Sequence, residues 1–350
     1  AAILGVVLTV GGILVCRSLL VWMNTPAEVL EDAVTYMRIY FGGVLFSVIY
    51  NMAAGILNAA GNSQRSLIYL GCASITNIIL DLVLIAGLRM GVEGAAIATF
   101  ISQAVGGVLP VFYFLNKRST SSIHLGRAQW NGGVIRSACI NGSSELMTNL
   151  SMSLVNILYN YQLLRFAGEN GVAAYGVIMY AAFLFVAVFV GYAVGSAPIV
   201  SYHYGARNHA ELNNLYSKSL RLIGVIAVVM TALSMLVIPY VARIFVGYDA
   251  ELLALTSHAF RVYALNFFLM GFNVYGSSFF TALGDGVTSA LISFLRTLLF
   301  QLLALIFLPM VLGIEGVWLA VTAAEAGALC VTALMFITKD KVFHYRKASC

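Results

Sequence analysis

Ten long apolar segments follow one another through this 350-residue chain, and they constrain its fold more than any other feature. A transmembrane helix needs about 20 apolar residues, because only a backbone with internal hydrogen bonds is stable in hydrocarbon. The expected spans are residues 2–22, 33–60, 65–88, 91–115, 134–165, 171–202, 217–245, 253–283, 286–311 and 313–338. The pattern predicts an all-α polytopic membrane protein embedded in the lipid bilayer.

Composition narrows the class further, because 61% of the residues are hydrophobic and only 9% are charged. A soluble domain carries about a quarter charged residues. This excludes a soluble enzyme, a disordered scaffold and a nucleic-acid partner. The five cysteines show no CxxC spacing, so neither a zinc site nor a disulfide framework is expected.

One sizeable polar interruption, residues 116–133, predicts a linker between an N-lobe (1–115) and a C-lobe (134–338), with a tail at 339–350. Basic residues gather in the linker, in the tail and in alternate connections between spans, whereas the other connections are acidic. The positive-inside rule then places the linker and the C-terminus in the cytoplasm. We expect a multi-pass protein of the inner (cytoplasmic) membrane.

An internal repeat organises the chain at a shift of 223 positions. The shift pairs charged residues and glycines: Glu28 with Glu251, Arg38 with Arg261, Gly61 with Gly284 and, after one deletion, Gly91-Val-Glu-Gly94 with Gly313-Ile-Glu-Gly316. Counterparts of spans 134–165 and 171–202 would precede residue 1, so we expect about 90 N-terminal residues to be missing. The repeat predicts ten spans of a 6+6, two-lobe transporter fold with both lobes in one orientation.

Asp81 is the intramembrane acid with the most informative context. Asn77 lies one turn earlier on the same helix face, and Thr99 is expected at a similar depth on the next, antiparallel helix. A carboxylate, an amide oxygen and a hydroxyl can take a proton or bind a hard cation such as Na⁺. The alternative is an interhelical hydrogen bond that only stabilises the bundle. Apolar residues at the repeat-equivalent positions, Phe300 and Ala304, favour a functional role.

Three further ionisable residues lie within spans. Glu145 is either a second protonatable group or contact for a cationic substrate, or a neutral, hydrogen-bonded buried carboxyl. Glu325 lies in a run of small residues and is expected to be a packing-site carboxyl. Arg296 either pairs with an acid or reaches the cytoplasmic boundary.

Aromatic, Met and amide side chains are frequent in the spans after the linker. They can line a cavity for flat lipophilic cations through stacking, cation–π contacts and the flexible Met side chain. Ordinary packing or lipid-facing residues would look the same. The candidates for substrate contact are Asn156, Asn160, Tyr175, Met179 and Asn273.

Several motifs together resemble the MATE (multidrug and toxic compound extrusion) transporters. They are Asn77-Ile-Ile-Leu-Asp81-Leu, Gly91-Val-Glu-Gly-Ala-Ala-Ile-Ala-Thr99, Gly55-Ile-Leu-Asn-Ala-Ala-Gly61-Asn and Ala197-Pro-Ile-Val-Ser-Tyr-His-Tyr-Gly205-Ala. The resemblance implies a secondary-active antiporter that exports drugs and other toxic, often cationic, small molecules by alternating access, coupled to H⁺ or Na⁺ influx. It also implies that Asn77, Asp81 and Thr99 belong to an N-lobe ion site. No cofactor beyond the coupling ion and no structural metal is implied, and we expect a monomer.

The two alternative functions are those of a flippase and of an intramembrane enzyme. A lipid-linked oligosaccharide flippase of the same superfamily would need a strongly cationic cavity, yet Arg296 is the only basic residue well inside a span. An intramembrane enzyme would need a motif such as HExxH or GxGD, and neither occurs in the sequence. We therefore expect a transporter rather than an enzyme.

Overall fold

The computed structural model describes residues 2–22, 27–115 and 131–345, and throughout these ranges the regular structure is helical. Contacts divide the chain into two units, Ala1–Gln129 and Trp130–Cys350. Most of the predicted linker, residues 116–130, lies outside the described residues, as does the end of the predicted tail.

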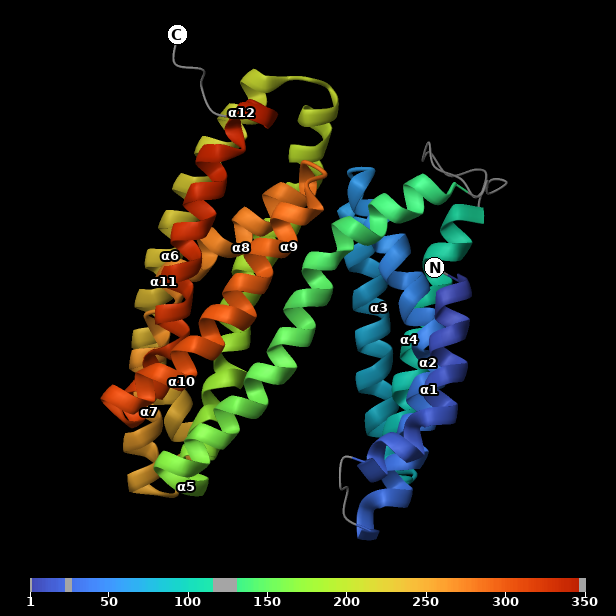
Figure 1. Ribbon diagram of the computed structural model, residues 1–350. Coiled ribbons are helices and arrows are strands. Elements are labelled where there is room, and N and C mark those ends of the chain that lie inside the picture. The colour runs from blue at the N-terminus through green and yellow to red at the C-terminus, as the bar shows by residue number, and fades with distance from the viewer. Residues whose placement is uncertain (1, 23–26, 116–130, 346–350) are drawn as a thin grey trace. The chain divides into compact units, whose positions relative to one another are not determined.

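Unit 1 is a bundle of four long helices (Figure 1). The helices are α1 (Ala2–Trp22), α2 (Ala27–Ala59), α3 (Ser63–Asp81), which continues as the π-helical turn η1 (Leu82–Gly87), and α4 (Gly91–Leu115). α2 packs against α1 and α4, and α3 packs against α4. α2 begins six residues before the predicted 33–60 span, and Glu28 in its first turn suits the positive end of the helix dipole.

α2 and α4 approach each other closely at Gly107. A Cβ atom at Gly107 would lie 2.6 Å from the backbone oxygen of Phe46. The outer surface remains apolar, since Ile78, Ile79 and Leu82 are each more than half exposed. Exposed apolar helices of this length are suited to contact with lipid.

Unit 2 contains the longest helix, α5 (Gly132–Gly205), followed by α6 (His209–Val246) and by α7 (Ala250–Ala264) with α8 (Phe267–Ala282). The chain continues through α9 (Gly286–Phe294), the π-helical turn η2 (Leu295–Leu299), α10 (Phe300–Leu312), α11 (Ile314–Thr338) and the short α12 (Asp340–Phe343). α5 packs against α8 and α9, and α10 packs against α11.

α5 is two antiparallel spans joined at Gly168, whose φ of 60° and ψ of −152° are not helical. A continuous helix of 74 residues would be about 110 Å long, several times the thickness of a bilayer core. Tyr175 donates a hydrogen bond to Asn156 Oδ1 at 3.0 Å and stacks on Tyr159, which only a reversal of the chain allows. Figure 1 shows the two arms. The predicted spans 134–165 and 171–202 are these arms.

With α5 counted as two, the described helices form ten spans: seven single helices of spanning length, the two arms, and the bent pair α7–α8. The predicted all-α, ten-span fold is therefore confirmed. The sequence predicted a span over 253–283, and the structure bends it by 47° at Leu265–Asn266. Buried Asn266 hydrogen-bonds through its amide nitrogen to the backbone oxygen of Tyr263 at this bend.

The backbone repeats as the sequence does. Gly61 and Gly284 have φ of 77° and 82°, and Gly91 and Gly313 have φ of 58° and 60°. The internal repeat pairs these glycines, Gly61 with Gly284 at a shift of 223 positions and Gly91 with Gly313 after one deletion. Positive φ costs a glycine little, so the same turns are built at equivalent places in both units.

The first residues of the predicted tail are folded against unit 2. Tyr345 is buried, and its hydroxyl donates to the backbone oxygen of Phe336 at 2.8 Å. Lys339 donates to Asp285 Oδ2 at 2.7 Å, which ties the end of α11 to the start of α9. Partial burial by itself raises the pKa of Asp285, but the hydrogen bonds from Lys339 and Thr288 outweigh it and hold that pKa below its ordinary value.

Candidate functional site

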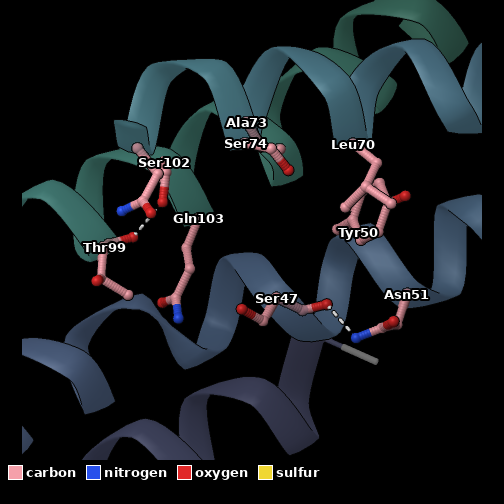
Figure 2. A pocket seen from close by; sticks show the side chains of 11 residues that line it. Ser47, Tyr50, Asn51, Leu70, Ala73, Ser74, Thr99, Ser102 and Gln103 are labelled. Carbon is pink, nitrogen blue, oxygen red and sulfur yellow. Dashed lines mark hydrogen bonds between the residues drawn. The ribbon is translucent and has the colours of Figure 1, made fainter. Parts of the chain in front are cut away.

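Unit 1 contains a cavity of about 260 Å³ between α2, α3 and α4. Three pairs of polar residues at i and i+4 surround it or flank it: Ser47 with Asn51, Asn77 with Asp81, and Thr99 with Gln103. Residues four apart share a helix face, so each helix turns polar side chains to one side. Figure 2 shows the α2 and α4 side chains of this cavity.

Asn77 and Thr99 both line the cavity, as the sequence predicted for a shared site. The Thr99 hydroxyl donates to the backbone oxygen of Ala95 at 2.9 Å, so its oxygen lone pairs remain available as acceptors. Ser102 likewise donates to the backbone oxygen of Thr99 at 2.8 Å (Figure 2). Both hydroxyl groups therefore donate their hydrogens to backbone oxygens of α4, and their oxygens can still accept a hydrogen bond or bind a cation.

Asp81 is half-buried and lies one turn beyond Asn77, but it is not among the residues that line the cavity. Within the described part of the chain its carboxylate makes no hydrogen bond or ion pair. α3 changes to the π-helical η1 directly after Asp81. Such π-turns are frequent at functional sites, because the extra residue redirects the helix face.

Gln103 is a cavity residue that the sequence reasoning missed. Its Oε1 atom is buried and has no hydrogen-bond partner among the described residues. A buried amide oxygen without a donor is costly, and it is a suitable ligand for a hard cation. The signal in the sequence was the spacing of four residues between Thr99 and Gln103, the same as between Asn77 and Asp81.

Unit 2 has a larger cavity of about 760 Å³ between the two arms of α5. Four of the predicted substrate residues line it: Asn156, Asn160, Tyr175 and Met179. Tyr180 and Phe183 line it too and are 76% and 72% exposed. The cavity therefore offers aromatic faces, a thioether and two amides.

Two predicted residues are elsewhere. Glu145 is exposed on the first arm of α5 and is not among the residues that line either cavity. Asn273 is fully buried on α8, where it contacts Glu325. Glu325 in turn pairs with Arg296 at 3.3 Å, which settles the open question of what Arg296 contacts.

Comparison with known proteins supplies the family. The sequence model of the MatE family matches residues 1–83 and 146–306, which is most of the chain. The chain belongs to the MatE family. As a MatE chain with ten apolar spans, it is a multi-pass membrane protein of a transporter family.

Curated relatives agree with this membership. Multidrug export protein MepA of Staphylococcus aureus (strain NCTC 8325 / PS 47) is 21% identical over 321 residues, which cover 91% of this chain and 70% of that protein. The protein of the same name from Staphylococcus saprophyticus is 21% identical over 344 residues, 97% of this chain and 75% of that protein.

Solved structures of MATE transporters have the same fold. A MATE protein in complex with MaL6 superposes with a TM-score of 0.91 at 27% identity, over 98% of this chain and 77% of that one. A MOP superfamily transporter from Pyrococcus furiosus gives a TM-score of 0.90 at 28% identity, over 97% of this chain and 77% of that one.

Proposed function

We propose that this protein is a secondary-active exporter of drugs and other small organic compounds, driven by the influx of H⁺ or Na⁺. Membership of the MatE family and the resemblance to multidrug export protein MepA support export. The observation that carries the coupling is the cavity of unit 1, which is lined by Asn77, Thr99 and Gln103, with the partnerless Asp81 one helical turn beyond Asn77.

The ion would bind at this cavity. A charge within the bilayer costs about 2.5–3.5 kcal/mol or more, so an unpaired Asp81 is stabilised by any proton or cation that neutralises it. A proton binds the carboxylate alone. Na⁺ needs several oxygens, and a rotation of the Asp81 side chain toward Asn77 would bring the carboxylate to the oxygens of the cavity.

The substrate would bind in the cavity of α5. Tyr175, Tyr180 and Phe183 offer aromatic faces to a flat molecule, with cation–π attraction if it is positively charged. Met179 adapts to different shapes, and Asn156 and Asn160 can donate or accept hydrogen bonds. This lining favours varied aromatic compounds over one specific ligand.

Coupling follows if the ion binds one conformation of the transporter more tightly than the other. Ion binding at Asp81 would then favour the state that releases substrate outward. We place the protein in the cytoplasmic membrane as a monomer, with the linker and C-terminus in the cytoplasm. A flippase for pyrophosphate-linked lipids is disfavoured, because Arg296 is neutralised by Glu325 instead of being free in a cavity.

Ethidium efflux from vesicles tests the proposal. The chain is reconstituted, ethidium is loaded, and a pH gradient and a Na⁺ gradient are imposed in separate experiments. We expect one gradient to drive efflux and Tyr175→Ala to weaken ethidium binding by about tenfold, the size of a lost aromatic contact. Efflux that ignores both gradients would contradict ion coupling.

A further inference from the structure

Unit 2 contains a buried ion pair that the proposed transport cycle does not use. Glu325 lies near the middle of α11, and its side chain is 3% exposed. Arg296 lies in η2, and its side chain is 13% exposed. Glu325 is eleven residues from the start of α11, or about 16 Å along the helix, so the pair lies deep in the span.

The carboxylate of Glu325 is held from two sides. Arg296 Nη1 contacts Oε1 at 3.3 Å, and Asn273 Nδ2 donates to Oε2 at 2.7 Å. Asn273 is fixed in turn by the Thr332 hydroxyl, which donates to its Oδ1 at 2.8 Å. The cluster therefore joins α8, η2 and α11.

This pair is not built for maximum stability. Arg296 contacts the carboxylate through one nitrogen at 3.3 Å, and its Nε is buried without a partner among the described residues. A buried pair offsets the cost of desolvating both ions only with excellent geometry and further hydrogen bonds. A bidentate contact would have satisfied the guanidinium better.

Tyr263 connects the cluster with the cavity of α5. It is a buried residue of α7, its hydroxyl lies 4.0 Å from the sulfur of Met179, and Met179 lines the cavity. The charge of Glu325 acts on the Tyr263 hydroxyl, and that hydroxyl is also within electrostatic range of Tyr175. One tyrosine thus lies between the substrate residues and the buried acid.

Few other charges act on Glu325. Arg296 is the basic group that pairs with it. Of the titratable groups of α7, which are Glu251, His258, Arg261 and Tyr263, Tyr263 interacts with it, whereas His258 pairs with the exposed Glu315. From α5, Tyr159 and Tyr175 lie beyond Tyr263, and α8 contributes the neutral Asn273. α9 and α10 carry no acidic, basic, Tyr or Cys side chain, and the charges of α12 lie at the far end of α11.

We propose that Glu325 is a second protonation site of the transporter, and that Met179 and Tyr263 couple its protonation to substrate in the α5 cavity. The proposal rests on the proposed function. A proton from solvent binds a carboxylate oxygen, the ion pair is lost, and Arg296 keeps its charge, so the cluster changes from neutral to a charge of +1. A cationic substrate nearby opposes that charge, and by linkage a protonated Glu325 weakens the binding of the cation.

Infrared difference spectroscopy of the full chain between about pH 8 and about pH 5 tests the site without any ligand. We expect a carbonyl band of a protonated carboxyl that Glu325→Gln abolishes. The matched control, Glu315→Gln, changes an exposed acid of the same helix and should retain the band. A band that is missing from the unaltered protein, or that survives Glu325→Gln, overturns the proposal.

The coupling is tested by adding ethidium. We expect it to lower the pH at which the band appears by about one unit, a tenfold coupling, and Tyr263→Phe to reduce that shift. A midpoint that ethidium leaves unchanged overturns the coupling. If Glu325→Gln does not fold, Glu325→Asp is used instead, and it must move the midpoint pH of the carbonyl band. An unmoved midpoint would also overturn the proposal. Failure of ethidium efflux, by contrast, bears on the proposed function and leaves the band unaffected.

A purely structural pair predicts a different result. Replacing both charges, as in Arg296→Met with Glu325→Met, removes a poorly solvated pair and is often neutral for stability. We expect this variant to fold and to lose the carbonyl band. The change of its ethidium affinity with pH should be at least about tenfold smaller than in the unaltered protein. Unchanged pH dependence would mean that the pair only joins helices.

Discussion

Residues 63–87 of unit 1 and 286–312 of unit 2 occupy the same place in the internal repeat, and each segment contains a π-turn beside an ionisable residue. In unit 1 the residue is Asp81, which has no partner in the described structure and lies one turn beyond Asn77 of the polar cavity. In unit 2 it is Arg296, which is neutralised by Glu325. Within the described residues, unit 1 therefore leaves its ionisable residue without a counter-ion, whereas unit 2 supplies one.

The largest difference between the units should appear in stability. Arg296→Ala leaves Glu325 buried without a counter-charge, which we expect to lower the free energy of unfolding by about 3–5 kcal/mol. Asp81→Ala removes no contact and should change it by less than about 1 kcal/mol. Denaturant titration of the purified variants in detergent measures both values. Equal losses would remove the contrast between the two units.

The reversal inside α5 is the next feature to test, because the core of unit 2 packs residues from both arms. Gly168→Ala puts a side chain at φ 60° and ψ −152°, which should cost about 1–3 kcal/mol of unfolding free energy. Gly195 is helical with open space around it, so Gly195→Ala should stabilise by about 0.5–1 kcal/mol. If both variants changed the unfolding free energy in the same direction, the result would argue against a break in the helix at Gly168.

Replacing one glutamine in each unit, Gln103 or Gln162, should change stability in opposite directions. Gln103→Leu in unit 1 removes a buried oxygen without a partner and should stabilise by about 1 kcal/mol while weakening ion binding. Gln162→Leu in unit 2 also removes a buried Oε1 without a partner, but it takes the hydrogen bond from the backbone oxygen of Leu305 and should destabilise by at most about 1 kcal/mol. Thermal unfolding with and without Na⁺ reads out both effects. Equal stabilisation of Gln103→Leu and the unaltered protein by Na⁺ would contradict an ion site at this oxygen.

The smallest expected effect is at the end of unit 2. The pKa of Asp285 is lowered in the folded protein, so its stabilising effect is present above the ordinary range of Asp and is lost as pH falls through the folded pKa. Asp285→Asn should therefore cost at most about 1 kcal/mol at about pH 6, and this cost should shrink as the pH falls below the ordinary range of Asp. Glu169→Gln, at an exposed acid, is the control. A loss that persists at low pH would point to the helix cap instead of the charge.

Much of the fold could be predicted because apolar length and glycine positions are local properties. The arms of α5 and the paired turns at Gly61 and Gly284 were visible in the sequence. The bend at Leu265–Asn266 was not, because neighbouring apolar residues hide a single amide that bonds back to Tyr263. No glycine or proline marks that break.

The sites were predictable only in part. Four substrate candidates of α5 line its cavity because their residue types are frequent on its two adjacent arms, whereas the fifth candidate, Asn273, binds Glu325 instead. The pairing of Arg296 with Glu325 depends on how α11 packs against η2, which one sequence does not specify. The position of Asp81 depends on the π-turn that follows it, and nothing in its residues distinguishes a π-turn from an α-turn.

Efflux by Asp81→Asn tests the central claim most directly. The variant is reconstituted in vesicles beside the unaltered chain, and ethidium export is followed under the gradient that drives it. We predict that Asp81→Asn binds ethidium as before but loses gradient-driven export by at least about tenfold. Export that keeps its full dependence on the gradient would contradict an ion site at Asp81.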